Sequence, residues 1–143
     1  MTFRILIMGL PGSGKTTLAR ELKNSYLKTA DWFNADDIRK QYNDWDFSLE
    51  GRIRQAHRMK ELAERSSAEV IMADFVAPLP EMREIYQADF TVWVDTINSG
   101  RYEDTNQMFI PPTIYDIRVT EKDINKWGIK IIKAIQQKHQ LEV

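Results

Sequence analysis

A glycine-rich segment near the amino terminus is the feature that most restricts the fold. Residues 9–16 read Gly-Leu-Pro-Gly-Ser-Gly-Lys-Thr, which satisfies the pattern G-x-x-x-x-G-K-[ST]. The apolar residues 3–8 before it predict a buried strand, and Leu18, Ala19 and Leu22 recur after it at helical spacing. Between a strand and a helix, such a loop turns backbone N–H groups toward phosphate oxygens. The sequence therefore predicts a nucleotide-binding phosphate loop.

We expect the ligand of this loop to be ATP with Mg²⁺. Lys15 supplies a cation near the transferred phosphoryl group and is a predicted catalytic residue, and Thr16 offers a hydroxyl to the metal. The predicted ATP-binding residues are Gly9, Pro11, Gly12, Ser13, Gly14, Lys15, Thr16 and Thr17. A turn without a ligand is the alternative, and the flanking strand and helix patterns disfavour it. Because no Asn-Lys-x-Asp segment reads guanine, a phosphotransferase fits this chain better than a GTPase.

Strand and helix patterns alternate along the rest of the chain. Further strands are predicted over residues 26–33, 70–73, 90–94 and 116–119, and helices over 34–41, 48–64, 80–86 and from Ile124 onward. Thr120 and Asp123 resemble a capping box before the last helix, whereas residues 98–115 have little periodicity. This order predicts an α/β fold, a three-layer sandwich with helices on both faces of a parallel sheet. Ligands bind such sheets at the carboxyl ends of the strands.

Composition narrows the class of protein. The chain has 143 residues, which fits one domain over 1–143, and its net charge of −1 predicts neither nucleic acid nor a membrane as a partner. It has no Cys and two His, which excludes disulfides, thiolate metal sites and a cysteine nucleophile. The apolar start is too short to span a bilayer and carries no cleavage-site pattern, so we expect a cytoplasmic protein. A small-molecule nucleotide is the expected partner, and the sequence leaves a homodimer open.

Phosphoryl transfer also requires a group that orients or deprotonates the acceptor hydroxyl. The segment 34–39 follows a predicted strand, so its acidic side chains should emerge beside the phosphate loop. Asp36 is the predicted catalytic base and, with Thr16, a predicted metal ligand, while Arg39 is a candidate anion site. Asp74 ends another buried strand and is a rival for the metal-side carboxylate. The alternative is that Asp36 and Asp37 merely favour a helix start.

From about Ile5 to Asp95 the chain resembles the adenylylsulfate kinase family, in which ATP phosphorylates the ribose 3′-hydroxyl of adenylylsulfate. The loop resembles the family's G-L-[SP]-G-[AS]-G-K-[ST]-T, and residues 34–39 resemble its D-G-D-N-[VI]-R. Residues 46–48 with Arg52 and Gln55 resemble L-G-F-S-x-x-D-R-x-x-N, and residues 75–78 with Arg83 resemble F-I-S-P-F-R-x-x-R. These matches keep the same order along the chain.

The resemblance implies a P-loop kinase-like fold and an acceptor site for adenylylsulfate. Phe47 would stack on the adenine, and Arg39 and Arg52 would hold the phosphosulfate. The full set of implied acceptor residues is Asp36, Arg39, Phe47, Arg52, Gln55, Phe75, Val76, Ala77 and Pro78. By spacing alone, Phe47 is also compatible with the core and Arg52 with the solvent-exposed face of a helix.

Several positions depart from the family pattern. Asn34, Ala77 and Pro80 stand where the family has Asp, Ser and Arg. The family's basic R-D-x-K-G-L-Y lid is missing, and the acidic segment 101–109 occupies its place. Two alternatives to an adenylylsulfate kinase stay open. One is a polynucleotide 5′-hydroxyl kinase, because residues 34–39 also resemble that family's N-x-D-D-x-R motif. The other is a nucleotide-binding module without turnover.

Overall fold

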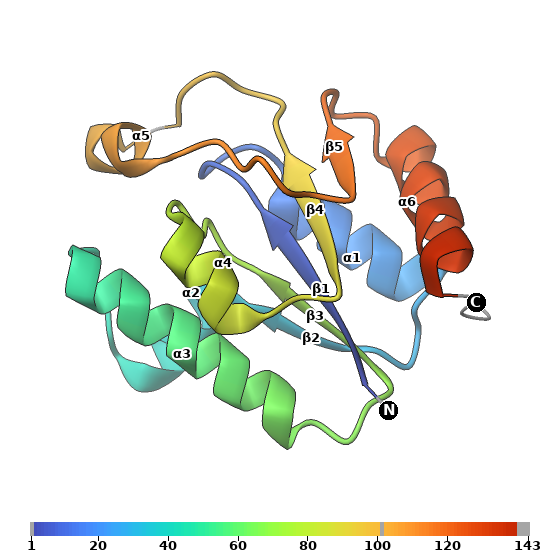
Figure 1. The fold of residues 1–143 in the computed structure, drawn as a ribbon, viewed down its shortest axis with the longest axis horizontal. Helices are drawn as coiled ribbons and strands as arrows, with labels where there is room; N and C mark the ends of the chain where they lie inside the picture. The colour runs from blue at the N-terminus through green and yellow to red at the C-terminus, as the bar shows by residue number, and fades with distance from the viewer. Residues whose placement is uncertain (1, 101, 140–143) are drawn as a thin grey trace.

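A five-stranded parallel sheet forms the centre of the fold (Figure 1). The computed structural model describes residues 2–100 and 102–139. The strands are β1 (Phe3–Met8), β2 (Asp31–Asn34), β3 (Val70–Asp74), β4 (Phe90–Val94) and β5 (Ile117–Val119), and their order in the sheet is β2-β3-β1-β4-β5. Because all pairings are parallel, every strand ends at the same edge. The predicted α/β sandwich is confirmed.

Helices cover both faces of the sheet. They are α1 (Lys15–Ser25), α2 (Ala35–Tyr42), α3 (Leu49–Arg65), α4 (Pro80–Tyr86), α5 (Glu103–Met108) and α6 (Ile124–His139). On β1, Ile5 and Ile7 face a core shared with α1 and α6, while Leu6 and Met8 face a core shared with α2, α3 and α4. This alternation follows from the period of two along a strand, and it explains why β1 is apolar on both faces.

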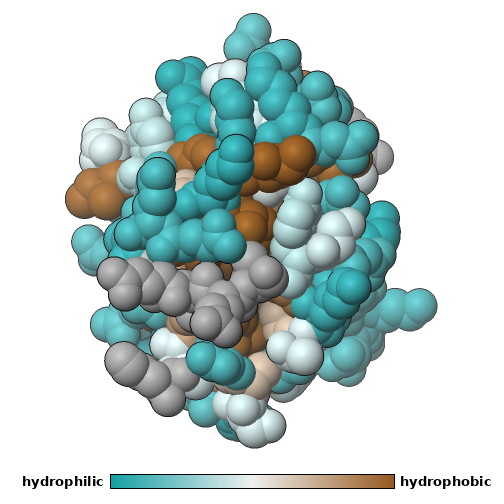
Figure 2. All heavy atoms as spheres, turned by 90° about the vertical axis from the view of Figure 1, so that its right-hand side faces the viewer, coloured by the Kyte–Doolittle hydropathy of each residue, from teal (hydrophilic) through white to brown (hydrophobic). Residues whose placement is uncertain are grey.

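The outer surface over α6 is mainly hydrophilic. Figure 2 shows this side of the molecule, with hydrophobic atoms visible as narrow strips among the hydrophilic side chains. Lys130 and Lys133 are exposed on α6, whereas Ile131 and Ile135 are buried beneath them. Within residues 2–100 and 102–139, no helix is both long enough and apolar enough to cross a membrane.

Three local predictions are wrong in detail. The second strand begins at Asp31 rather than at residue 26, because Leu27 and Ala30 reach the core from a turn that follows α1. The cap of α6 is Asp123, whose Oδ1 accepts the N–H of Lys126 at 3.1 Å, so the capping box from Thr120 does not form. The aperiodic stretch 98–115 contains the short helix α5.

Candidate active site

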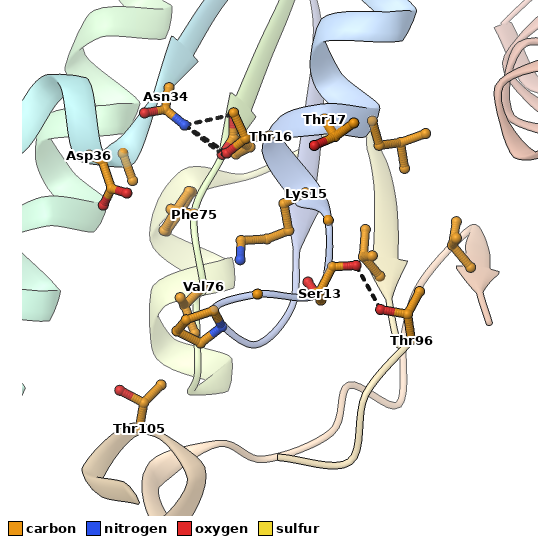
Figure 3. A pocket seen from close by; sticks show the side chains of 18 of the residues that line it. Ser13, Lys15, Thr16, Thr17, Asn34, Asp36, Phe75, Val76, Thr96 and Thr105 are labelled. Atoms are coloured by element: carbon orange, nitrogen blue, oxygen red, sulfur yellow. Dashed lines mark hydrogen bonds between the residues drawn. The ribbon is translucent and has the colours of Figure 1, made fainter. Parts of the chain in front are cut away.

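A cleft of about 930 Å³ opens at the carboxyl ends of the strands (Figure 3). The phosphate loop lines it with residues 11–17, and the ends of β2 and β3 add Asn34 and Asp74. The loop between α2 and α3 contributes Trp45 and Phe47, and residues 102, 104 and 105 come from the segment around α5. Segments far apart in the sequence therefore meet in one cleft.

The phosphate loop owes its shape to glycines. Gly12 and Gly14 have φ angles of +87° and +103°, which residues with a side chain rarely adopt. Gly9 is different, because it lies outside the cleft lining and packs against the end of β4. A Cβ at Gly9 would lie 2.4 Å from the carbonyl oxygen of Val94. Gly9 thus supports the loop from behind, while the other predicted ATP-binding residues line the cleft.

Lys15 extends from the start of α1 into the cleft (Figure 3). Its Nζ donates a 3.0 Å hydrogen bond to the carbonyl oxygen of Leu10. Burial lowers the pKa of this ammonium group to about 8, and the negative charges of Asp74 and Asp36 act in the opposite direction. A buried cation between two carboxylates is suited to binding a strongly anionic ligand.

Asp74 is the centre of a polar cluster beside the loop. Its Oδ1 accepts hydrogen bonds from Thr16 Oγ1 at 3.2 Å and Asn34 Nδ2 at 3.0 Å, and its Oδ2 accepts one from Trp32 Nε1 at 2.6 Å. Burial raises the pKa of the Asp74 carboxyl to about 6, although the hydrogen bonds and the charge of Lys15 oppose this rise. Carboxylate and hydroxyl oxygens are the ligands that Mg²⁺ prefers, so Thr16 and Asp74 form a suitable donor pair.

Asp36 lies near this cluster, two residues after Asn34 (Figure 3). It occupies the first turn of α2, its side chain is exposed, and it points into the same space as Lys15 (Figure 3). The predicted metal pair was Thr16 with Asp36, but the carboxylate that contacts Thr16 is Asp74. Asp36 borders the part of the cleft where the predicted acceptor residues lie.

Two buried arginines hold the loop between α2 and α3. The guanidinium of Arg39 lies 4.3 Å from the ring centroid of Phe47, and that of Arg52 lies 5.4 Å from it. Phe47 is 47% exposed and Arg52 is 7% exposed. A core position for Phe47 and a solvent-facing position for Arg52 are therefore both wrong.

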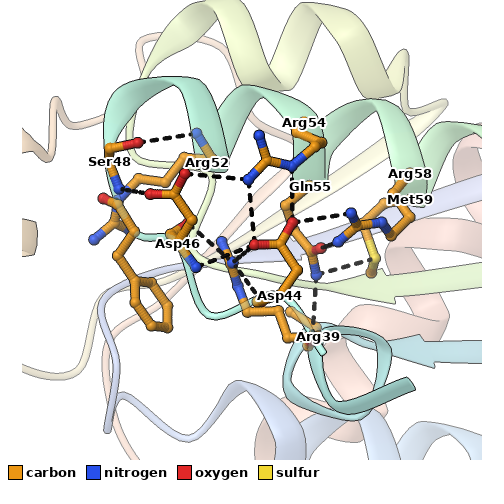
Figure 4. Close-up of polar contacts among 12 residues, drawn as sticks. Arg39, Asp44, Asp46, Ser48, Arg52, Arg54, Gln55, Arg58 and Met59 are labelled. Carbon is orange, nitrogen blue, oxygen red and sulfur yellow. Dashed lines mark hydrogen bonds and ion pairs between the residues drawn. The ribbon is translucent and has the colours of Figure 1, made fainter. Parts of the chain in front are cut away.

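A network around Asp44 connects this loop to α3 and α2 (Figure 4). The Asp44 carboxylate accepts hydrogen bonds from Arg54 and Arg58, which hold the pKa of this carboxyl well below its usual range. Arg58 donates to Gln55 Oε1 at 2.8 Å, and Gln55 Nε2 donates to the carbonyl oxygen of Ala35 at 3.1 Å. The chain of contacts ends next to Asp36.

The nine residues of the predicted acceptor site border one small cavity. Its volume is about 60 Å³, and it adjoins the main cleft through Asp36, Phe47 and Arg52, which line both. The nine are Asp36, Arg39, Phe47, Arg52, Gln55, Phe75, Val76, Ala77 and Pro78. Four different segments supply these residues.

Sequence reasoning missed other residues that line the cleft. Thr105 on α5 accepts a hydrogen bond from Arg52, and Lys122 after β5 donates one to the carbonyl oxygen of Gly12 at 3.0 Å. Trp45 and Trp127 also line the cleft. Lys122 could have been proposed from the sequence because it lies just after the last predicted strand, whereas no pattern in the sequence marks Thr105.

Comparison with solved structures finds the same fold in P-loop kinases. The APS kinase CysC from Mycobacterium tuberculosis, in complex with AMPPNP and APS, has a TM-score of 0.77 and 20% identity, covering 94% of this chain and 98% of that chain. Shikimate kinase from Acinetobacter baumannii, in complex with shikimate, has a TM-score of 0.70 and 18% identity, covering 99% and 97%. A gluconokinase from Sinorhizobium meliloti 1021 has a TM-score of 0.70 and 13% identity, covering 96% and 94%.

The family follows from the sequence profile. No curated protein matches the chain. The profile of adenylylsulphate kinase matches residues 1–99, which is more than half of the chain and includes the phosphate loop, Asp36 and the predicted acceptor residues of α3. The resemblance noted in the sequence is thereby confirmed. The chain belongs to the adenylylsulphate kinase family.

Proposed function

We propose that this protein transfers the γ-phosphoryl group of ATP to the 3′-hydroxyl of adenylylsulfate, giving 3′-phosphoadenylylsulfate. The observation that carries the proposal is that Asp36, Phe47, Arg52, Phe75 and Val76 line the main cleft together with the phosphate loop, while the other four predicted acceptor residues border the small cavity that adjoins it. A kinase needs its donor and acceptor sites to meet in this way, because the reacting atoms must be held close together.

On the donor side, residues 11–17 bind the phosphates of ATP and Lys15 stabilises the negative charge of the transferred group. Thr16 and Asp74 would hold a Mg²⁺ ion, since their oxygens lie 3.2 Å apart beside the loop. When bound, this ion neutralises charge on the phosphate oxygens. Asp74 replaces Asp36 in this role because Asp74 is the carboxylate in contact with Thr16.

On the acceptor side, Asp36 accepts the proton of the 3′-hydroxyl while the new bond between that oxygen and the γ-phosphorus forms. The bond between the γ-phosphorus and the β,γ-bridging oxygen breaks, and ADP leaves. Asp36 fits this role because it faces both cavities and lies close enough to Lys15 to influence its charge.

Recognition of adenylylsulfate rests on Phe47, Arg39 and Arg52. Phe47 offers a half-exposed aromatic ring for the adenine, and the two guanidinium groups beside it match an acceptor that carries anionic groups. A neutral sugar carries no anionic group that could pair with these two guanidinium groups. A long nucleic acid strand would need a wider basic track than a chain of net charge −1 supplies.

Turnover of ATP in the presence of separate acceptors tests the proposal. The acceptors are adenylylsulfate, an oligonucleotide with a 5′-hydroxyl, shikimate, gluconate and water alone, with products identified by mass. We expect ADP and 3′-phosphoadenylylsulfate to form together in equal amounts, with at least tenfold preference for adenylylsulfate because its charged groups satisfy both arginines. Faster transfer to any other acceptor, or ATP consumption without transfer, would overturn the proposed acceptor.

A further inference from the structure

The segment between β4 and β5 is tied to the acceptor side of the cleft at two separate places. At one, the N–H of Ile110 donates to the carbonyl oxygen of Pro78 at 2.8 Å, and Arg83 donates to the carbonyl oxygens of Ala77 and Ile110. At the other, Arg52 Nη2 donates a buried 2.7 Å hydrogen bond to Thr105 Oγ1 on α5. This segment thus contacts Pro78 and Arg52 directly, which are two residues of the proposed acceptor site.

Two hydrogen bonds, one of them to Thr105, hold the long side chain of Arg52 on two sides of its guanidinium group. Arg52 Nε donates to the carbonyl oxygen of Phe47 at 2.8 Å, so the guanidinium extends from the loop before α3 to helix α5. Thr105 is 2% exposed, and it lines the main cleft together with Asp104 and Arg52. The negative charge of Asp104 favours the charged form of Arg52, against the effect of burial.

We infer that Thr105 is a positioning residue that holds the Arg52 guanidinium in the orientation in which it binds the anionic part of the acceptor. The inference rests on the proposed function, since it takes Arg52 as an acceptor-binding group. An arginine side chain loses considerable rotamer entropy when it is immobilised. Thr105 imposes this order before the acceptor arrives, so binding requires less ordering. Loss of the hydroxyl also leaves a buried donor of a charged group without its partner.

The test compares Thr105→Val, which keeps the shape and removes the hydroxyl, with Thr105→Ser, which keeps the hydroxyl. Thr113→Val is the matched control, because Thr113 is exposed and lies in the same segment. We expect Thr105→Val to raise the KM for adenylylsulfate on the order of tenfold. Its KM for ATP and its kcat should stay within about twofold of the wild type, because the donor side is untouched. Thr105→Ser and Thr113→Val should match the wild type.

A merely structural role for Thr105 would disturb both substrates together. Equal increases in the two KM values, or an unchanged KM for adenylylsulfate in Thr105→Val, would overturn the inference. So would a Thr105→Ser variant as impaired as Thr105→Val, because the retained hydroxyl should rescue the interaction with Arg52.

Chymotrypsin cleavage near Tyr102 and Phe109 gives a readout without any acceptor. We expect Thr105→Val and Arg52→Ala to be cleaved faster than the wild type, and the double variant to be cleaved no faster than either single variant, because both remove one interaction. Additive effects would overturn the inference. If the wild type does not phosphorylate adenylylsulfate, the proposed function fails, and the cleavage rates still decide whether Thr105 orders Arg52.

Discussion

Asn34 and Asp74 are register partners at the ends of the adjacent strands β2 and β3, and Asn34 Nδ2 donates a 3.0 Å hydrogen bond to Asp74 Oδ1. Asn34 Oδ1 also accepts the N–H of Asp37 and caps α2. An Asp at position 34, which the family motif has, could serve as the cap but would repel the carboxylate of Asp74. The amide at position 34 and the carboxylate at position 74 therefore depend on each other. Together they keep one negative charge beside Thr16.

Exchanging these two side chains tests this dependence. We expect Asp74→Asn to lower kcat/KM for ATP with Mg²⁺ on the order of a hundredfold, because the charge of the proposed metal ligand is lost. Asn34→Asp alone should also impair turnover, because two carboxylates then adjoin. The double variant restores one charge at the same strand ends, so we expect it to exceed Asp74→Asn by at least tenfold in the same steady-state assay. A double variant no better than Asp74→Asn would contradict the pairing.

The raised pKa of Asp74 predicts an acid limb in the activity of the enzyme. Its carboxyl has a pKa of about 6, so kcat/KM for ATP with Mg²⁺ should fall about tenfold per pH unit below that value as the charge is lost. Measuring kcat/KM for ATP between pH 5 and pH 8 at saturating Mg²⁺ checks this expectation. An activity that is constant down to pH 5 would contradict an essential charge on Asp74.

The same shift makes a prediction about stability. The pKa of Asp74 in the folded protein lies above its ordinary value near 4. The contribution of this group to the free energy of unfolding is therefore fully present below about pH 4 and is lost as pH rises through about 6. Asp74→Asn does not titrate. The free energy of unfolding of Asp74→Asn, relative to that of the wild type, should therefore increase by up to about 3 kcal/mol between pH 4 and pH 7.5. Urea unfolding at both pH values measures the gain, and a constant difference would argue against the shift.

Removing the cation of the phosphate loop should abolish most turnover. Lys15→Ala loses the buried ammonium group that we propose balances charge on the transferred phosphoryl, so we expect kcat to fall on the order of a hundredfold or more. Lys133→Ala, on the exposed side of α6, is the control and should behave as the wild type. A Lys15→Ala variant with normal turnover would show that ATP does not react at this loop.

The sequence was most informative where one residue pattern determines one local structure. The strand, glycine loop and helix at residues 3–25 follow directly from apolar spacing and from positive φ angles that glycine accommodates. Asp74 could be proposed as a rival carboxylate, but its contact with Thr16 depends on β3 lying between β1 and β2, which spacing does not reveal. Likewise, α5 has six residues without apolar periodicity. Contacts such as Thr105 with Arg52 are what define its place, and they are visible only in three dimensions.

Asp36→Asn separates binding of the donor from transfer. The substitution keeps the size of the side chain and removes its charge and its ability to accept the hydroxyl proton. We expect calorimetry to show ATP binding within about threefold of the wild type, while kcat falls on the order of a hundredfold. Asp37→Asn, the exposed neighbour on α2, is the matched control and should retain activity. Unchanged transfer in Asp36→Asn would assign the proton acceptor elsewhere.

Arg52→Ala should impair the acceptor and spare the donor. The guanidinium lies against Phe47 and donates a hydrogen bond to Thr105 on α5, so under the proposed function its loss removes a charged contact to the acceptor. We expect the Kd of adenylylsulfate for the complex with ADP and Mg²⁺ to rise at least tenfold, since interactions with a charged partner contribute about 1.5 to 3 kcal/mol. The Kd of ATP should stay within about twofold, as it should in the control Arg65→Ala on the exposed face of α3. Equal weakening of both ligands in Arg52→Ala would instead mean that this arginine supports the whole cleft and does not select the acceptor.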